Sequence, residues 1–401
     1  MNFNPRVIEI SGIEQAQREL TRICCDPAGI SIMAPKAVSR AIKIESVPVK
    51  AANLLKQTFL AKGGEVAVSR DTASFNAAKT DVLILATLKQ YQQALSQLRQ
   101  QPWGLPDLAE AILKVLSHQS QPIVRNYQSR NPPFQITSGK TLVMGILNIT
   151  PDSFSDGGKY NNIDQAIRYA EAMVAEGADI IDIGAESTRP YGSQKISAEE
   201  ELDRLLPLLN KLLTILPVPV SIDTYKSVVA EEVLKLGVHL INDIWGLQGD
   251  ANMASVAARY NVPVVIMHNQ TGTEYNRDIM ACINDFLQNS IQIGLKAGVA
   301  ADNFIIDPGI GFGKTPQQNL AVMARLEELR ALGCPILLGT SRKRFIGEAL
   351  NLPMEERVEG TAATVALGIT KGVNIVRVHD VKAIARVARM TDVLLGGRNV
   401  E

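Results

Sequence analysis

Side chains that can ionise or form paired hydrogen bonds follow a series of short apolar runs in the C-terminal part of the chain. The first run, 141–147, stops at Asn148, and a loop rich in Asp, Ser and Gly with one aromatic residue, Phe154, follows it. The residues after the later runs are Asp182, Asp223, Asn242, His268, Asp307, the Ser341-Arg342-Lys343 group, and Arg377 with His379. A single carboxylate in such a place is usually a helix cap. A whole series at strand ends favours a polar site for a small molecule.

Acceptors and an amide in this series indicate a ring ligand. Asp223, Asn242 and Asp307 offer the groups that recognise a fused heterocycle with amino and oxo substituents. The segment 307–315 resembles a phosphate-binding loop, but that pattern needs a glycine where Pro308 stands, and the segment follows the sixth strand. We therefore reject a nucleotide-hydrolase site and expect these glycines to let the backbone approach a flat ligand beside Asp307.

Positive charge in the same series indicates an anion. Arg189, Lys343, Arg377 and His379 suit a phosphate ester, in a chain whose formal net charge is zero. Asn148 adds a neutral oxygen donor, and Mg²⁺ typically takes few protein ligands and completes its shell with phosphate and water. The residues alone thus predict an aromatic heterocycle that carries a phosphate, with Mg²⁺ at Asn148.

The elements that must position these residues alternate regularly from about residue 140 onward. The predicted strands are 141–147, 179–183, 218–222, 238–241, 262–267, 303–306, 336–338 and 374–378. Amphipathic helical patterns lie between them, for example at 163–176, 198–216, 227–236, 317–332 and 381–395. Eight strands, each followed by a helix, predict a (β/α)8 barrel over residues 140–401. A doubly wound sheet is the alternative.

The first part of the chain does not continue this pattern. Residues 1–124 are predicted to form a small separate α/β domain in which we identify no site. Its predicted strands are 30–33, 41–45, 65–69 and 81–86, and its predicted helices are 13–22, 49–61, 91–100 and 105–118. Residues 125–139 include Asn131-Pro132-Pro133 and have the composition of a linker.

The bulk composition excludes several classes of protein. Lysine plus arginine and aspartate plus glutamate both number 41, so net charge gives no sign of a nucleic-acid or membrane surface. Apolar stretches such as 82–88 fall short of the ~20 residues that span a bilayer, and the N-terminus lacks the pattern of a signal peptide. The cysteines, at 24, 25, 282 and 334, have no metal-ligand spacing. Free thiols indicate a reducing compartment, so we expect a cytoplasmic protein.

The motifs resemble those of dihydropteroate synthases. Residues 144–158, Met-Gly-Ile-Leu-Asn-Ile-Thr-Pro-Asp-Ser-Phe-Ser-Asp-Gly-Gly, resemble the first signature of that family. Residues 177–190, Gly-Ala-Asp-Ile-Ile-Asp-Ile-Gly-Ala-Glu-Ser-Thr-Arg-Pro, resemble the second. The remaining blocks follow in the family's order at 221–224, 241–243, 307–314, 339–343 and 377–380. The resemblance covers residues 140–401 and leaves the N-terminal domain outside.

This resemblance implies a role for each matching residue. The pterin ring would be held by Asp223, Asn242, Asp307 and Lys343. The pyrophosphate would be held by Asn148, Arg377 and His379, with Asn148 as the Mg²⁺ ligand. The p-aminobenzoate site would be shaped by Phe154, Thr188, Arg189, Pro190 and Ser341. The catalytic set would be Asp182, Asp223, Lys343 and Arg377, with Asp182 near the reacting methylene.

The implied activity is a transferase reaction of folate biosynthesis. 6-Hydroxymethyl-7,8-dihydropterin pyrophosphate would condense with p-aminobenzoate through Mg²⁺-assisted, dissociative loss of pyrophosphate. No serine lies in a Gly-x-Ser-x-Gly turn, and this reaction requires no protein nucleophile. The resemblance also implies a homodimer and a sulfonamide target, although residues 191–197 differ from the usual second loop. The alternatives are a non-catalytic pterin-binding paralogue and a methyltetrahydrofolate-binding methyltransferase domain.

Overall fold

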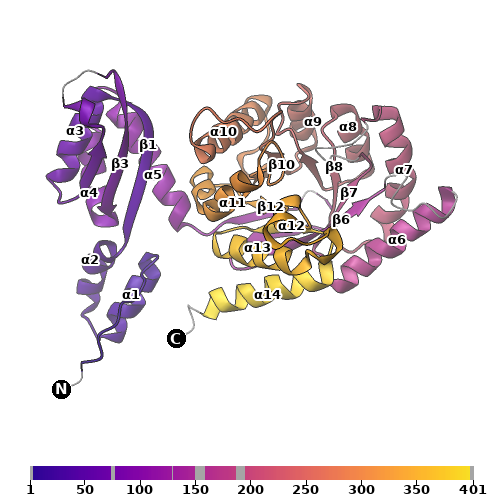
Figure 1. Ribbon diagram of the computed structural model, residues 1–401, viewed down its shortest axis with the longest axis horizontal. Helices are drawn as coiled ribbons and strands as arrows, with labels where there is room; N and C mark the ends of the chain where they lie inside the picture. Colours follow the sequence, from indigo (N-terminus) through magenta and orange to yellow (C-terminus); the bar gives the residue numbers. More distant parts are fainter. Residues whose placement is uncertain (1–2, 74–76, 129, 150–158, 187–194, 398–401) are drawn as a thin grey trace. The chain divides into compact units, whose positions relative to one another are not determined.

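The computed structural model describes residues 3–73, 77–128, 130–149, 159–186 and 195–397. The chain divides into two compact units, Met1–Gln121 and Pro122–Glu401 (Figure 1). Each unit has its own apolar core. They are described separately below.

The N-terminal unit is a three-stranded antiparallel sheet with helices. Its strands, in the sheet order β1-β3-β2, are β1 (Ser39–Pro48), β3 (Lys79–Thr87) and β2 (Glu65–Val68). Its helices are α1 (Ile13–Arg22), α2 (Pro27–Ala37), α3 (Val49–Leu60), α4 (Leu88–Leu98) and α5 (Leu105–Ser120). Alternate residues of β3 are buried, among them Val82 and Ile84, and they pack in one core with Phe59 of α3 and Tyr91 of α4. Period-two burial of this kind is typical of a sheet covered on one face.

One predicted strand of this unit is wrong. Residues 30–33 lie inside helix α2. The helix begins at Pro27, directly after Asp26, whose carboxylate accepts hydrogen bonds from the backbone amides of Ala28 and Gly29. A capping aspartate and a proline at the first helical position are strong start signals, and they outweigh the β-branched residues that follow.

The segment with linker composition contains regular structure. Strands β4 (Val124–Tyr127) and β5 (Phe134–Thr137) pair antiparallel as a hairpin within the second unit. Tyr127 and Ile136 are buried in a cluster with residues of the barrel strands. The Tyr127 hydroxyl donates to the carbonyl of Asp302 at 2.9 Å. The hairpin is buried by contacts with distant parts of the chain, such as that of Tyr127 with Asp302, 175 residues away. Contacts of this kind leave no local pattern in the sequence, so composition alone did not predict the hairpin.

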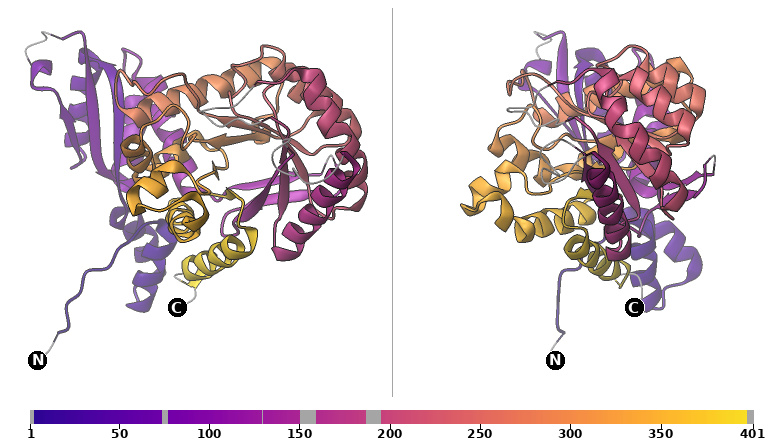
Figure 2. Two further views of the ribbon diagram at one scale, coloured as in Figure 1. Left: turned by 45° about the vertical axis from the view of Figure 1, so that its right-hand side comes forward. Right: turned by 90° about the vertical axis from the view of Figure 1, so that its right-hand side faces the viewer.

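The second unit is an eight-stranded parallel barrel, as predicted (Figure 2). Its strands are β6 (Leu142–Asn148), β7 (Ile180–Gly184), β8 (Val220–Asp223), β9 (Leu240–Asp243), β10 (Val264–Met267), β11 (Phe304–Asp307), β12 (Leu337–Leu338) and β13 (Ile375–Val378). The sheet order β11-β10-β9-β8-β7-β6-β13-β12 is closed by a parallel bridge between Ile306 and Ile336. The single closed sheet excludes the doubly wound alternative.

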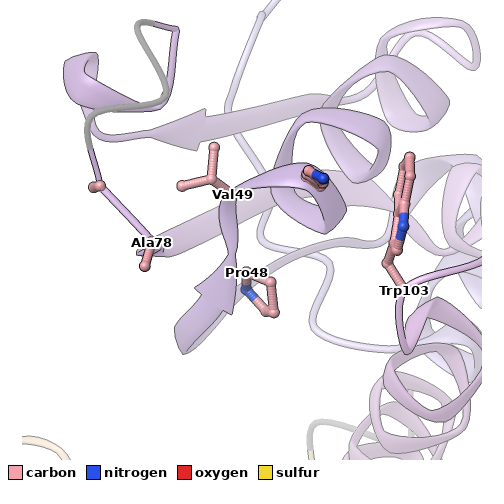
Figure 3. A pocket seen from close by; sticks show the side chains of 6 residues that line it. Pro48, Val49, Ala78 and Trp103 are labelled. Carbon is pink, nitrogen blue, oxygen red and sulfur yellow. The ribbon is translucent and has the colours of Figure 1, made fainter.

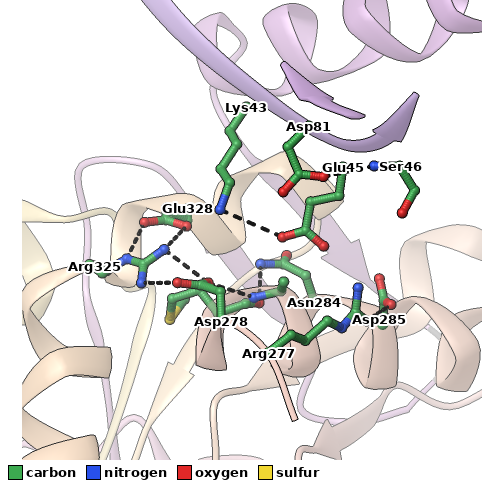
Figure 4. A network of polar contacts seen from close by, with 12 residues as sticks. Lys43, Glu45, Ser46, Asp81, Arg277, Asp278, Asn284, Asp285, Arg325 and Glu328 are labelled. Carbon is green, nitrogen blue, oxygen red and sulfur yellow. Dashed lines mark hydrogen bonds and ion pairs between the residues drawn. The ribbon is translucent and has the colours of Figure 1, made fainter. Parts of the chain in front are cut away.

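Helices surround the strands. They are α6 (Lys159–Glu176), α7 (Ala198–Ile215), α8 (Ser227–Leu236), α9 (Met253–Tyr260), α10 (Ile279–Ala297), α11 (Pro316–Ala324), α12 (Arg344–Leu350), α13 (Val358–Thr370) and α14 (Val381–Gly397). The predicted helix 317–332 is divided at Arg325 into α11 and a 3₁₀ segment, Leu326–Leu332. The Arg325 guanidinium binds the carboxylates of Asp278 and Glu328 there (Figure 4). Arg325 thereby ties α11 to the start of α10.

The barrel interior changes character along the strands. A lower layer is apolar and consists of Leu142, Met144, Ile180, Leu240, Val265, Ile305, Leu337 and Ile375 together with the hairpin residues Tyr127 and Ile136. Side chains two residues apart on a strand share a face. Two residues beyond Ile180, Leu240 and Ile305 come Asp182, Asn242 and Asp307, and two beyond Ile375 comes Arg377. The upper layer is therefore polar, at the carboxyl ends of the strands. Within the described residues, no helix combines the length and apolar character needed to cross a membrane.

Candidate active site

Arg377 is the centre of the polar layer. Its Nε donates to Oδ2 of Asp182 at 2.6 Å, and its Nη2 donates to Oδ2 of Asp223 at 2.8 Å. Asn242 Nδ2 donates to the same Asp182 oxygen at 3.1 Å. Four residues from strands β13, β7, β8 and β9 thus converge across the barrel, as their places at the strand ends predicted. The three charged members are all in the predicted catalytic set.

This cluster has unused hydrogen-bonding capacity. Oδ1 of Asp182 and Oδ1 of Asp223 are buried and, among the described residues, have no hydrogen-bond partner. Burial raises the pKa of Asp223, and Arg377 opposes that rise. A buried acceptor without a partner costs about 1–3 kcal/mol. Two such acceptors in one cluster suit a ligand that offers N–H groups.

Asp307 and Lys343 form the next part of the site. Asp307 is 5 % exposed and accepts a hydrogen bond from the backbone amide of Gly309 at 2.7 Å. Lys343 Nζ donates to the carbonyl of Ile310 and lies 4.7 Å from the centre of the Phe312 ring. Burial raises the pKa of Asp307, and burial lowers the pKa of Lys343 to about 8. The acid and the base of this part of the site both titrate nearer to neutrality than they do in water.

Asn148, Ser341 and His379 come from neighbouring strand ends. The Ser341 hydroxyl lies 3.0 Å from Nδ1 of His379 and accepts from the His379 backbone amide at 3.0 Å. Asn148 is half-buried at the end of β6. A Cβ placed on Gly184 would lie 3.5 Å from Oδ1 of Asn148 and 3.6 Å from Cβ of Asp223, so this glycine leaves the space between them open. Ser341 therefore contacts a residue of the predicted pyrophosphate group, although the resemblance assigned it to the p-aminobenzoate group.

Four predicted residues lie outside the described part of the chain. They are Phe154 in the first loop and Thr188, Arg189 and Pro190 in the second. Their assignment to p-aminobenzoate remains a prediction.

Three further residues lie around this site: His268 was in the predicted polar series without an assigned role, and Phe312 and Lys314 had no role assigned from the sequence. Phe312 provides the ring beside Lys343. Lys314 and His268 lie under the Asp307 loop, with Lys314 Nζ 2.9 Å from Nδ1 of His268. Burial and the neighbouring Lys314 lower the pKa of His268 to about 3, so its imidazole is neutral. A lysine directly after a glycine-rich run was the available signal; the rejected phosphate-binding loop and the family block 307–314 both contained it, but neither gave it a role.

A hollow in the N-terminal unit offers a contrast. It has a volume of about 500 Å³ and is lined by Pro48, Val49, Lys50, Ala77, Ala78 and Trp103 (Figure 3). Among the described residues that line it, Lys50 is the one ionisable group. Nothing in the lining resembles the converging carboxylates of the barrel, so the barrel mouth is the candidate active site.

Comparisons with known proteins identify the family of this site. The family model described as "Pterin binding enzyme" matches residues 144–379. The chain is 57 % identical to dihydropteroate synthase from Bacillus subtilis over 256 residues, which cover 64 % of this chain and 89 % of that protein. The chain belongs to the dihydropteroate synthase family of pterin-binding enzymes. The predicted family and its enzyme class, transferase, are confirmed.

Solved structures and a longer relative extend this result. A dihydropteroate synthase from Clostridium difficile, crystallised in the presence of pteroic acid, is 55 % identical with a TM-score of 0.63, covering 64 % of this chain and 97 % of that one. The Xanthomonas albilineans enzyme with 4-aminobenzoic acid is 36 % identical with a TM-score of 0.64, covering 69 % and 99 %. A probable bifunctional folylpolyglutamate synthase/dihydropteroate synthase from Halobacterium salinarum is 36 % identical over 98 % of this chain and 47 % of its own length. That match includes the N-terminal unit as well as the barrel.

Proposed function

We propose that the barrel binds the dihydropterin ring between Asp223, Asn242, Asp307 and Lys343 and transfers its methylene group to p-aminobenzoate. The supporting observation is the pair of buried carboxylate oxygens, one on Asp182 and one on Asp223, that have no hydrogen-bond partner among the described residues. The amino and ring N–H groups of a pterin are donors of the kind these acceptors require. The Clostridium difficile relative crystallised with pteroic acid supports the same class of ligand.

The pyrophosphate is proposed to lie at Asn148, Arg377 and His379. Among the described residues, no group of three His, Cys, Asp or Glu side chains is placed to hold a metal ion. The half-buried amide of Asn148 suits Mg²⁺, which accepts one neutral protein oxygen when phosphate and water supply the rest of its shell. Bound there, Mg²⁺ would neutralise charge on the leaving pyrophosphate.

The reaction proposed for these residues is dissociative. The bond between the methylene carbon and the pyrophosphate oxygen breaks, and the oxygen keeps the electron pair. Arg377 donates toward the anion, while the carboxylates of Asp182, Asp223 and Asp307 stabilise the cationic methylene carbon that remains. The amine nitrogen of p-aminobenzoate then attacks that carbon and releases a proton. Asp182 and Asp223 are already held by Arg377 at 2.6 and 2.8 Å, so these groups need little reorganisation.

The p-aminobenzoate site is proposed to include Phe154, Thr188, Arg189, Pro190 and Ser341. The last of these is buried at the mouth beside His379. The Xanthomonas albilineans relative with 4-aminobenzoic acid supports this substrate. Sulfonamide binding at the same place is part of the proposal, and a Yersinia pestis relative solved with a sulfonamide drug supports it.

A homodimer in the cytosol completes the proposal. Exposed apolar side chains on α14, namely Met390, Val393 and Leu394, support an interface formed by barrel helices. The four cysteines, all in the described part of the chain, form no disulfide, and this supports a reducing compartment. Sedimentation of the purified chain measures the oligomeric state, and a monomer at micromolar concentration would contradict the dimer.

Turnover with labelled p-aminobenzoate tests the reaction. The purified full chain, the dihydropterin pyrophosphate and Mg²⁺ are expected to give labelled dihydropteroate. A chain that binds the pterin without forming product would be the non-catalytic paralogue. A chain that binds pterin but not pyrophosphate would favour the methyltransferase alternative.

Asp307→Ala tests the assignment of the pterin site. We expect a loss of about 2–4 kcal/mol in pterin binding, because donors of the ring are left unpaired in a buried pocket. Calorimetry with 6-hydroxymethylpterin measures it. Asp285→Ala is the matched control, since Asp285 pairs with Arg277 on the surface and is 67 % exposed. Near-normal binding by the Asp307 variant would refute the assignment.

A further inference from the structure

Lys314 has a buried ammonium group with three close acceptors. Its Nζ lies 2.9 Å from the carbonyl oxygen of Gly309, 3.1 Å from that of Phe312 and 2.9 Å from Nδ1 of His268. The residue is 8 % exposed. An ammonium has three N–H donors, so each donor has one acceptor. The charged form is fully satisfied inside the protein.

These contacts fold the loop after β11 around the ammonium. Both carbonyls belong to residues 309–312 of the same loop, and His268 comes from the end of β10. Gly309 has φ +67°, and a Cβ there would lie 1.9 Å from the carbonyl oxygen of His268. The loop therefore passes tightly against β10, where only a glycine fits. The middle of the loop is held by Asn319, whose Oδ1 accepts from the Gly311 amide at 2.7 Å.

The opposite side of this loop faces the proposed pterin site. Its Gly309 amide donates to Asp307, its Ile310 carbonyl accepts from Lys343, and its Phe312 ring lies beside the Lys343 ammonium. Ile310 lies between the two residues whose carbonyls Lys314 holds. Any shift of the loop at Lys314 is thus transmitted to the contacts that orient Asp307 and Lys343.

We infer that Lys314 is a positioning residue for pterin binding: its ammonium gathers the Gly309 and Phe312 carbonyls and so sets the loop that orients Asp307 and Lys343. The inference rests on the proposed function, because it assigns Lys314 to the pterin end of that site. Lys314 does not act as a phosphate-binding lysine, since its three donors are all used within the protein. The pyrophosphate end, at Asn148, Arg377 and His379, comes from strands β6 and β13, whereas this loop follows β11, so we expect pyrophosphate binding to be independent of the loop.

Lys314→Met tests this inference in the full chain, because methionine keeps most of the apolar part of the side chain and removes the N–H donors. We expect the affinity for 6-hydroxymethylpterin to fall at least about tenfold. The affinity for pyrophosphate with Mg²⁺ should stay within about twofold, and the KM for p-aminobenzoate should change little. Calorimetry gives the two affinities. Lys371→Met is the matched control, since Lys371 also donates to a carbonyl, that of Ala324, but lies away from the site.

His268→Ala provides a second variant in case Lys314→Met does not fold. It removes one acceptor and leaves both carbonyls bound, so pterin affinity should fall about threefold to tenfold and pyrophosphate affinity should not. If both ligands weaken equally in the folded variants, Lys314 is a general stability residue and the inference is wrong. Unchanged pterin affinity would also overturn it. If the unmodified chain itself does not bind the pterin, the proposed function fails instead.

Discussion

The two ends of the barrel interior differ in polarity, although the same strands supply both. At the lower end, Ile180, Leu240 and Ile305 meet Tyr127 and Ile136 of the hairpin in a dry apolar layer. Two residues further up, the same strands present buried carboxylates and an amide around Arg377, and two of the carboxylate oxygens have no partner in the described structure. The lower layer stabilises the fold, whereas the upper layer holds polar groups in readiness for a ligand at a cost to stability. The same inward-facing, period-two positions therefore serve fold stability at the lower end of the strands and ligand binding at the upper end.

The largest effect expected from breaking this division is that of Arg377→Met. Removing the guanidinium leaves Asp182 and Asp223 facing each other in a buried site without a cation. We expect the free energy of unfolding to fall by about 3–5 kcal/mol. We also expect turnover to be lost. Urea denaturation and the labelled-substrate assay measure the two losses. Arg259→Met is the control, because the pair of Arg259 with Glu231 is on the surface, and an equally small effect of both substitutions would contradict the role of Arg377.

Ile136→Ala probes the lower layer alone. The side chain is fully buried, so its truncation should leave a cavity and lower the free energy of unfolding by about 2–5 kcal/mol. The kcat/KM of the folded variant should be unchanged, since the hairpin lies at the opposite end of the strands from the site. Val124→Ala, in the exposed part of the same hairpin, is the control. A large change in kcat/KM would mean that the two layers are not independent.

The smallest expected effect is the dependence of pterin affinity on pH, which involves the upper layer alone. Burial lowers the pKa of Lys314 to about 7 and that of Lys343 to about 8, so both lose their protons as the pH rises through this range. Burial raises the pKa of Asp307, so that carboxylate gains its proton earlier as the pH falls. Burial also raises the pKa of Asp223 to about 7, so this carboxylate is ionised above that pH, and further loss of the lysine protons should lower pterin affinity from about pH 8, by up to about tenfold per unit. Binding measured from pH 6 to pH 9 tests this, and Lys314→Met should give a weaker but flatter profile. A constant affinity over that range in the unmodified chain would refute it.

Much of the upper layer was predictable because each polar residue directly follows an apolar run. The structure places four of these residues at or near the carboxyl ends of their strands, as predicted: Asp182, Asp223, Asn242 and Asp307. What the sequence could not supply is the pairing: Arg377 and Asp182 are 195 residues apart, and their contact depends on the closure of the whole barrel. For the same reason the Lys314 contacts were missed, since His268 belongs to another strand end.

The lower layer was less predictable. Residues 125–139 contain Asn, Pro, Ser and Gly in the proportions of a linker, yet two short strands form there because Tyr127 and Ile136 can be buried against the barrel. In the N-terminal unit, local signals at Asp26 and Pro27 outweighed the β-branched pattern at 30–33. Short elements depend on what packs against them, and that information is not local.

The closure of the barrel gives the ligand a second role. Strand β12 has two residues, and the sheet is closed by the bridge between Ile306 and Ile336. Asp307 follows Ile306 on one side of this seam, and Lys343 follows β12 on the other. A pterin bound by both residues would link β11 to the segment after β12, where the barrel has few strand-to-strand hydrogen bonds. By mass action the bound enzyme would then be harder to unfold than the empty one, so resistance to heat or proteolysis would report occupancy in a cell where turnover cannot be followed.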